Sequence, residues 1–136
     1  MKYVLDTTAF SALMRRDEML LPFLKCRHAN DFVTVPPVVA EIESGIRRLE
    51  KSSKKYVMLN SEKKRILNVI EVLPWNSEAS KHFGMIKAEL ERQGNLIDDF
   101  DIAIGAIAIS HQCAVLTANI KHFKRISALQ SLSWLS

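Results

Sequence analysis

The sequence has little of what marks a disulfide-stapled, membrane-spanning or low-complexity protein. There are only two cysteines in 136 residues, Cys26 and Cys113. Both lie in apolar surroundings without the spacing of a Cys/His metal site, so we expect buried free thiols rather than disulfides. The longest apolar run, 102–109, is far shorter than the roughly 20 residues that cross a bilayer, which predicts no membrane span. The chain also lacks repeats.

The composition is that of an ordinary globular protein, and we expect a single domain over residues 1–136. The N-terminus runs almost directly into a predicted strand and leaves no room for the apolar stretch of a signal peptide, so we expect a cytoplasmic protein. The formal net charge is +4, and the basic residues cluster at 15–16, 47–55, 63–65 and 121–125. Most such clusters are solvated helix faces, but basic residues around an acidic pocket are also what a phosphodiester substrate requires.

Helix and strand patterns alternate along the chain, which indicates an α/β domain with a parallel sheet. The predicted strands are 3–5, 32–35, 69–73, 114–116 and an edge strand at 132–135. The predicted helices are 10–14, 19–24, 36–49, a basic helix before 69, one that Asn76 or Ser77 caps and Gly94 ends, and 98–109. A loop or an exposed helical turn is expected at 51–56. The helix at 98–109 is apolar on every side and is expected to be buried against the sheet.

Four acidic residues stand where predicted strands end or helices begin: Asp6, Glu41, Asp98 and Asp101. Asp98 and Asp101 are three positions apart and project from one face of the helix that they open, whereas Asp99 points away from both. The simple interpretation is that each acid caps a helix or complements its dipole. Thr8 would cap the first helix as well as Asp6 does.

The alternative is a divalent-metal site at the carboxyl edge of the sheet, where ligands bind in parallel folds. Asn119 ends the strand 114–116 much as Asp6 ends the first strand. Carboxylates that meet at such an edge repel one another and raise each other's pKa values. A hard cation such as Mg²⁺ or Mn²⁺ relieves that repulsion and accepts phosphate oxygens. The acids therefore predict a metal-dependent site.

Short motifs with a characteristic order and spacing run through the chain: Tyr3-Val-Leu-Asp-Thr-Thr8, Val39-Ala-Glu-Ile-Glu-Ser-Gly45, Leu73-Pro74, the helix 86–94, Ile97-Asp-Asp-Phe-Asp-Ile-Ala-Ile-Gly-Ala106, Leu116-Thr-Ala-Asn119, His122-Phe123 and Trp134. Together they resemble PIN-domain ribonucleases of the VapC type, the toxins of VapBC toxin–antitoxin pairs. The resemblance covers nearly the whole chain. It implies a three-layer α/β/α sandwich around a central parallel sheet of four or five strands.

By this resemblance the catalytic acids of the family fall on Asp6, Glu41 and Asp101. Asp6 and Asp101 are then the direct ligands of Mg²⁺, or of Mn²⁺ in its place. Either Asp98 or Asp99 supplies an additional outer ligand, and the resemblance does not choose between them.

The positions around these acids are polar, but two of them depart from the family pattern. Thr7 and Thr117 match positions that hydrogen-bond near the site. Thr8 stands where the family often has asparagine, and Asn119 stands where many PIN domains have a fourth acid. Asn119 can orient a metal-bound water but brings no charge, which leaves open whether one or two metal ions bind.

The resemblance implies the toxic component of a type II toxin–antitoxin system. Such proteins hydrolyse RNA phosphodiester bonds with a metal-activated water, leaving a 5′-phosphate and a 3′-hydroxyl. They usually form homodimers and are neutralised by a VapB-type antitoxin whose tail blocks the active site. The apolar segments 10–24 and 38–49 are candidates for that contact, and core packing explains them equally well. Neither the RNA target nor the antitoxin is readable from the sequence.

Other functions fit the residues less well. The histidines have no paired spacing suited to metal-free RNA cleavage and are expected to be surface or packing residues: His28, His82, His111 and His122. A haloacid-dehalogenase-type phosphotransferase uses Asp-x-Asp, but Thr8 takes the place of the second acid. A receiver domain would need an acidic pair at the end of the first strand. The alternative to a nuclease is a non-catalytic PIN scaffold that binds nucleic acid or protein, and the retained acids argue against it.

Overall fold

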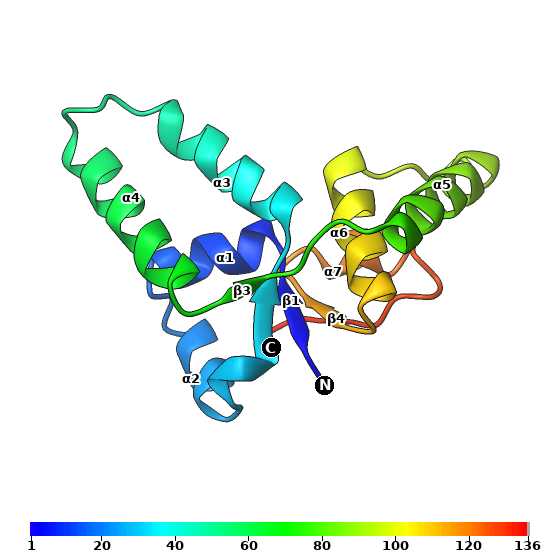
Figure 1. Cartoon of the computed structure of the whole chain (residues 1–136), viewed down its shortest axis with the longest axis horizontal. Helices are drawn as coiled ribbons and strands as arrows, with labels where there is room; N and C mark the ends of the chain where they lie inside the picture. The colour runs from blue at the N-terminus through cyan, green and yellow to red at the C-terminus, as the bar shows by residue number, and fades with distance from the viewer. Residues whose placement is uncertain (136) are drawn as a thin grey trace.

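The computed structural model describes residues 1–135, which form a five-stranded sheet with helices on both sides (Figure 1). The strands lie in the order β3 (Glu71–Val72), β2 (Phe32–Thr34), β1 (Tyr3–Leu5), β4 (Ala114–Leu116) and β5 (Ser131–Leu132). Every neighbouring pair is parallel. The central strands are continuous apolar runs because both of their faces are covered by helices. The prediction of an α/β fold with a parallel sheet of four or five strands is confirmed.

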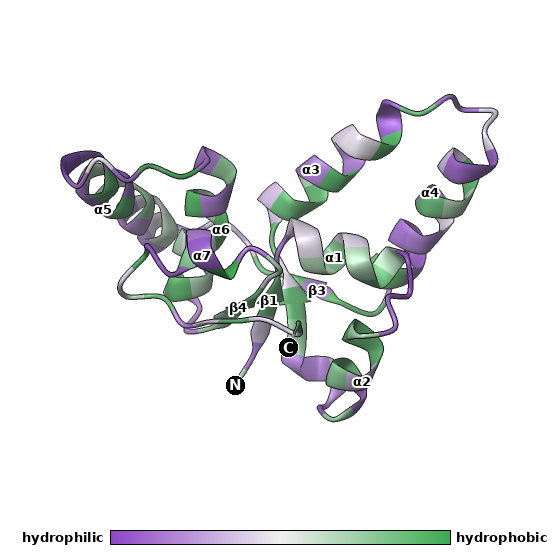
Figure 2. Cartoon of the chain, turned by 180° about the vertical axis from the view of Figure 1, so that it is seen from behind, coloured by the Kyte–Doolittle hydropathy of each residue, from purple (hydrophilic) through white to green (hydrophobic). Residues whose placement is uncertain are grey.

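The helices are α1 (Thr7–Met14), α2 (Leu20–Lys25), α3 (Pro36–Arg47), α4 (Lys54–Leu67), α5 (Ser77–Arg92), α6 (Asp99–Ser110) and α7 (Ile120–Phe123). In Figure 1, α1 to α4 lie on one side of the strands and α5 to α7 on the other, which gives the three predicted layers. Two arms, α3 with α4 and α5 with α6, diverge beyond the carboxyl ends of the strands. Figure 2 shows that α6, next to the strands, is mainly hydrophobic, whereas the outer helices α4 and α5 carry hydrophilic faces.

Side-chain caps move two helix boundaries away from their predicted positions. Asp6 accepts a hydrogen bond from the backbone N–H of Ala9, so α1 begins at Thr7 rather than at residue 10. Ser53 accepts one from the N–H of Tyr56, so α4 begins within the segment predicted as a loop or turn. The cap positions therefore decide helix starts that the apolar periodicity alone places too late.

Several short elements also differ from the expectation. The strands expected at 69–73 and 132–135 are two-residue pairings at 71–72 and 131–132. The helix α7 and a 3₁₀ turn at Ala29–Asp31 were not predicted, because elements this short show no helical period. Both cysteines are free, but Cys26 is exposed. The prediction that it is buried is wrong, because Cys26 follows the end of the short peripheral helix α2.

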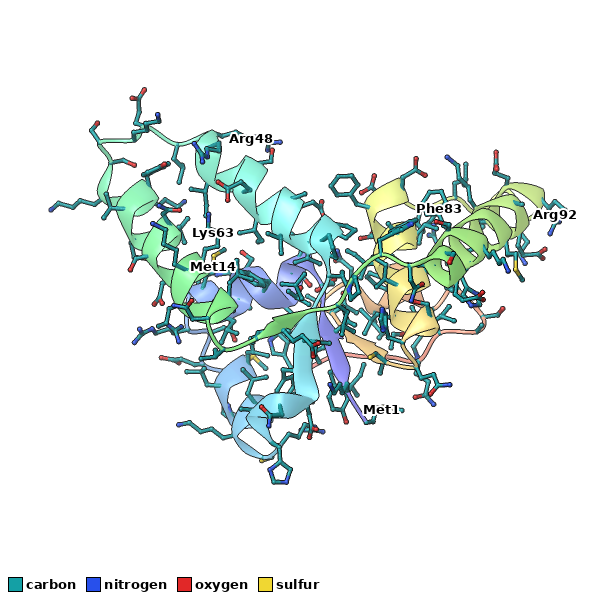
Figure 3. All side chains as sticks on the ribbon, in the orientation of Figure 1. Met1, Met14, Arg48, Lys63, Phe83 and Arg92 are labelled. Atoms are coloured by element: carbon teal, nitrogen blue, oxygen red, sulfur yellow. The ribbon has the colours of Figure 1, made fainter. Side chains whose placement is uncertain are left out.

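An ion pair ties the two helices of the first arm together. The Nζ of Lys63 on α4 lies 2.5 Å from Oε2 of Glu43 on α3, and Figure 3 shows Lys63 in the space between these helices. Arg47 pairs with the other oxygen of Glu43 at 2.8 Å. The hydrogen bonds from Lys63 and Arg47 hold the pKa of Glu43 below its usual range. This contact steadies α3, the helix that carries Glu41.

The helix α6 is buried over its whole circumference from Ile102 to Ala108. A Cβ atom added to Gly105 would lie 2.9 Å from Cδ1 of Ile126 and 3.3 Å from Cδ2 of Leu129, so the glycine permits the close packing of the loop after α7. The packing of α6 fixes the acids at its first turn. No helix within residues 1–135 is long and apolar enough to cross a membrane.

Candidate metal centre

Asp6 lies where β1 ends and α1 begins, with only 2% of its surface exposed. Its Oδ1 accepts hydrogen bonds from the N–H of Ala9 at 2.9 Å and from the hydroxyl of Thr8 at 2.6 Å. Its Oδ2 accepts one from the hydroxyl of Thr117 at 2.6 Å. Burial raises the pKa of Asp6, and the hydrogen bonds from Thr117 and the other donors oppose that rise. Asp6 is therefore both the cap of α1 and a buried carboxylate.

Thr8 and Thr117 join the carboxyl ends of β1 and β4. The hydroxyl of Thr8 accepts a hydrogen bond from the N–H of Ala118 at 2.9 Å, and that of Thr117 accepts one from the N–H of Asn119 at 2.8 Å. Each hydroxyl thus accepts from a backbone group and donates its own proton to Asp6. The sequence predicted a supporting role for Thr117 but treated Thr8 only as an alternative cap or a departure from the family.

Thr117→Val should destabilise the protein by about 1–3 kcal/mol at neutral pH, because it leaves the buried Oδ2 of Asp6 without this donor. Removing a donor to the charged form raises the pKa of Asp6 further. A carboxyl group whose pKa is higher in the folded state than in the unfolded state destabilises the fold as the pH rises from the lower pKa to the higher one. At acidic pH Asp6 is protonated, so the difference in free energy of unfolding between Thr117→Val and wild type should shrink. Urea unfolding at a series of pH values measures the effect.

Thr34→Val is the matched control for this prediction. The hydroxyl of Thr34 is also buried, but it donates to the backbone carbonyl of Leu5 at 2.9 Å, which does not titrate. The stability lost in Thr34→Val should therefore be independent of pH over the range in which Asp6 titrates. If the stability lost in the two variants depended on pH in the same way, Thr117 would not act by stabilising the charged form of Asp6.

Glu41 approaches the same edge of the sheet from α3. Pro36 and Pro37 occupy the first turn of that helix, so Glu41 lies in its second turn. The side chain is half-buried, and its Oε1 accepts a hydrogen bond from the hydroxyl of Thr7 at 2.5 Å. Because Thr7 directly follows Asp6, this contact ties Glu41 to the strand end that carries Asp6.

Asp101 lies half-buried in the first turn of α6. Burial is the main cause that raises its pKa, and the negative charges of Asp6 and Asp98 raise it further. The opposing effect comes from His122, whose Nδ1 lies 3.3 Å from Oδ2 of Asp101. Charges near the protein surface interact appreciably only over short distances. The effect of Asp6 and Asp98 on Asp101 therefore indicates that these acids lie near one another. The structure thus brings together acids from β1 and from the start of α6.

The neighbouring acid Asp99 is turned to another partner. Its Oδ1 lies 3.1 Å from the Nζ of Lys87 on α5. Asp98 is the N-terminal cap residue of α6 but makes no side-chain capping hydrogen bond. With its charge acting on Asp101, Asp98 is the better candidate for the additional acid of the site.

Two residues that follow β4 make contacts near the acids that the sequence did not predict. Asn119 precedes α7 and is exposed, and it bonds toward the site through its backbone N–H rather than through its side-chain amide. His122 is a surface residue, as predicted, and its ring also contacts Asp101. The four-residue helix α7 turns His122 back toward the acids. A histidine three residues after a polar strand end was the only available signal for that contact.

These groups fit a hard divalent cation that keeps part of its water shell. Their donors are carboxylate oxygens, which Mg²⁺ and Mn²⁺ prefer. Within residues 1–135, no three histidine, cysteine or acidic side chains converge closely enough to hold an ion by themselves. The observation that favours a cation is the raised pKa of Asp101, which burial and then the charges of Asp6 and Asp98 cause, since a bound cation would offset both effects.

A family model of the PIN domain matches residues 3–129. The chain belongs to the PIN domain family. The match runs from β1, which Asp6 follows, to the loop that packs on Gly105, and β5 follows it.

Comparison with individual proteins places VapC proteins among the relatives of this PIN domain. It is 28% identical to Ribonuclease VapC2 of Haemophilus influenzae over 135 residues, or 99% of each chain. It is 37% identical to the tRNA(fMet)-specific endonuclease VapC of Shigella flexneri over 65 residues, or 48% of this chain and 49% of the relative.

Solved structures give the same result. VapBC-1 from nontypeable Haemophilus influenzae matches with a TM-score of 0.85, 27% identity and 100% of both chains covered. VapBC2 from Rickettsia felis, bound to a DNA fragment from its promoter, matches with a TM-score of 0.85, 27% identity and 98% of this chain and 99% of the other covered. The resemblance to VapC-type PIN domains is confirmed.

Proposed function

We propose that this PIN domain is a Mg²⁺- or Mn²⁺-dependent endoribonuclease and the toxic component of a type II toxin–antitoxin system. The observation that carries the proposal is the meeting of Asp6 and Asp101, two carboxylates from β1 and α6 whose pKa values are both raised by burial. Perturbed acids at the carboxyl edge of a parallel sheet suit metal-assisted hydrolysis better than helix capping alone. The names of the relatives, a ribonuclease and a tRNA endonuclease, support RNA as the substrate.

The residues divide the reaction between them. Asp6 and Asp101 would hold the cation, which when bound stabilises charge on the scissile phosphate and lowers the pKa of a water. Glu41, held by Thr7, orients the attacking water and accepts its proton. The hydroxyl of Thr117 stabilises the charged form of Asp6. Hydrolysis of this kind leaves a 5′-phosphate and a 3′-hydroxyl and requires no 2′-hydroxyl.

The purified protein should cleave a single-stranded RNA in Mg²⁺ or Mn²⁺ and should lose that cleavage in EDTA. Gel electrophoresis of an end-labelled RNA measures the reaction and identifies the new ends. Cleavage that returns when Mg²⁺ is added back separates the loss of the ion from unfolding. Cleavage that persists unchanged in EDTA would contradict metal dependence, and RNA binding without cleavage under any condition would favour the non-catalytic scaffold.

We also propose that a VapB-type antitoxin docks in a groove of about 360 Å³ between α1, α2 and α4. The lining is mainly apolar, with a cationic rim: Leu5, Leu13, Leu21, Leu24, Lys25, Arg27, Ala29, Phe32, Arg65, Ile66, Val69 and Ile70. Such a surface suits an amphipathic segment that carries acidic residues. The related VapBC structures support a partner of this class. Of the two segments that the sequence offers for this contact, 10–24 lines the groove and 38–49 does not.

A homodimer in the cytoplasm completes the proposal. Trp75 is exposed just before α5, and its ring centroid lies 6.1 Å from that of Phe83. Val72 is exposed three residues earlier. Exposed aromatic and aliphatic side chains that gather in this way are typical of protein interfaces, so we assign this surface to a second copy of the chain. Light scattering that gives the mass of one chain at micromolar concentration would contradict the assignment.

A further inference from the structure

Phe100 is an exposed aromatic residue at the start of a helix that is otherwise buried. Its exposed fraction is 42%, whereas the residues from Ile102 to Ala108 of the same helix are buried. It lies in the first turn of α6, directly between Asp99 and Asp101. The exposed part of this aromatic side chain, beside the acids, is apolar surface that a ligand can contact.

The positively charged side chain of Lys87 lies beside the same turn of α6. The Nζ of Lys87 on α5 is 3.1 Å from the carboxylate of Asp99, and both side chains are accessible to solvent. Exposed ion pairs of this kind are weak, so the ammonium group can exchange the carboxylate for a phosphate. Figure 3 shows Phe83, one helical turn before Lys87, where α5 runs beside α6.

The three residues of this turn point in successive directions around the helix. Each residue is turned by about 100° from the one before it, because the helix has about 3.6 residues per turn. Phe100 therefore projects between Asp99, which meets Lys87, and Asp101, which contacts His122. The direction of Phe100 thus lies between that of the Lys87 ion pair and that of Asp101, a residue of the candidate metal centre.

We propose that Phe100 and Lys87 form a nucleotide subsite for unpaired RNA next to the metal centre. The inference rests on the proposed nuclease function and names the part of the substrate that this surface takes. One base stacks on the ring of Phe100, the phosphate on one side meets Lys87, and the phosphate on the other side reaches Asp101 and its cation. Because the bases of a duplex already stack on one another, the subsite selects single strands and loops.

A second copy of the chain suits this surface less well than RNA does. A protein partner that covered Phe100 would also desolvate the carboxylates of Asp98, Asp99 and Asp101, which is costly without matching charges. An RNA strand instead brings phosphates that share the cation with these acids. Stacking is also tolerant of sequence, since every base has an aromatic face, and we expect the subsite to favour unpaired RNA over particular bases.

The test is the binding of a short unpaired RNA that contains 2-aminopurine and hydrolysis-resistant phosphorothioate linkages, in Mn²⁺. Stacking should quench the fluorescence of the 2-aminopurine. Phe100→Leu, which keeps an apolar side chain but loses the ring, should weaken binding by roughly 5- to 150-fold and remove the quenching. Phe100→Trp should retain both. Lys87→Gln should weaken binding and reduce its salt dependence by about one phosphate contact.

Met85→Ala, which shortens an exposed apolar side chain on α5, the helix of Lys87, is the control and should bind as wild type does. Unchanged affinity and quenching in Phe100→Leu would overturn the subsite, even where metal-dependent cleavage of ordinary RNA upholds the nuclease. A change of oligomeric mass in Phe100→Leu, without a change in RNA affinity, would assign the ring to a protein interface and overturn the inference. Quenching that depends on Phe100 in a protein that cleaves no RNA would support the subsite and contradict the nuclease.

Discussion

Asp101→Asn is expected to abolish RNA cleavage and, in the absence of metal, to make the folded protein more stable. Both effects have one cause. Burial and the charges of Asp6 and Asp98 raise the pKa of Asp101, so its carboxylate is less favourable in the folded state than in water. Asparagine keeps the shape of the side chain and its acceptor for His122 but has no charge. The substitution therefore removes the charge repulsion and also the carboxylate that would hold the metal ion.

The two effects are measured side by side. Losing a ligand should remove the stabilisation that the cation gives the transition state, which is worth several kcal/mol, so cleavage by Asp101→Asn should fall close to background. In EDTA the variant should unfold at a higher temperature than wild type. Mg²⁺ should raise the Tm of wild type, because binding to the folded state stabilises it, and should leave that of the variant nearly unchanged. Circular dichroism with and without the ion, beside the cleavage assay, records both.

The same shift sets the pH dependence of metal-free stability. Folded Asp101 keeps its proton to a higher pH than the unfolded chain does, so wild-type stability should fall as the pH rises from the ordinary pKa of 3.8 through the raised value. In Asp101→Asn the stability should not show the part of this decrease with pH that Asp101 causes. Glu78→Gln is the control, since Glu78 also lies in the first turn of a helix but pairs with Lys81 at the surface. Wild-type cleavage by Asp101→Asn would place the metal elsewhere.

Val69→Asp should prevent the antitoxin from neutralising the protein. Val69 lines the groove between α1, α2 and α4, close in sequence to Arg65 at its cationic rim, and is 73% exposed. An acidic partner that suits this rim would meet a like charge, and like charges at an interface cost several kcal/mol, which is more than about 100-fold in affinity. Because the side chain is already in solvent, the substitution should leave the folding stability almost unchanged.

Val57→Asp is the matched control for the groove. Val57 lies on α4, which Val69 follows, and is 60% exposed, but it does not line the groove. Each variant is purified, and its affinity for the VapB-type antitoxin is measured by calorimetry. Only Val69→Asp should lose the complex, and both should retain metal-dependent cleavage. Equal affinities for the two variants would move the contact away from this groove.

The fold class and the positions of the main acids were predictable because both depend on local patterns. The apolar run before Asp6 stops at a polar residue, which marks a strand end. The acids before the apolar stretch of α6 mark a helix start in the same way. That Asp6, Glu41 and Asp101 carry catalysis stays a prediction, and the expected loss of cleavage in Asp101→Asn is its test.

Contacts between distant residues could not be predicted in the same way. The choice between Asp98 and Asp99 depends on Lys87, which reaches Asp99 only because α5 packs along α6. The contact of His122 with Asp101 depends on a helix too short to leave a period in the sequence. The exposure of Cys26 was misjudged because apolar neighbours in sequence indicate burial only where an element is long enough to have an inner face.

The hydrogen bond between Asp6 and Thr117 joins residues that are 111 positions apart in the chain. β1 also needs β4 as a neighbour, and β4 is the fourth of the five strands to be synthesised. During translation the first strand and α1 therefore emerge long before the residues that complete their surroundings. Until residues 114–117 have left the ribosome and paired with β1, Asp6 lacks Thr117 and α6 lacks the strand against which it packs. A nascent or truncated chain therefore lacks the assembled acids, and the proposed nuclease site can form only when most of the chain has been made.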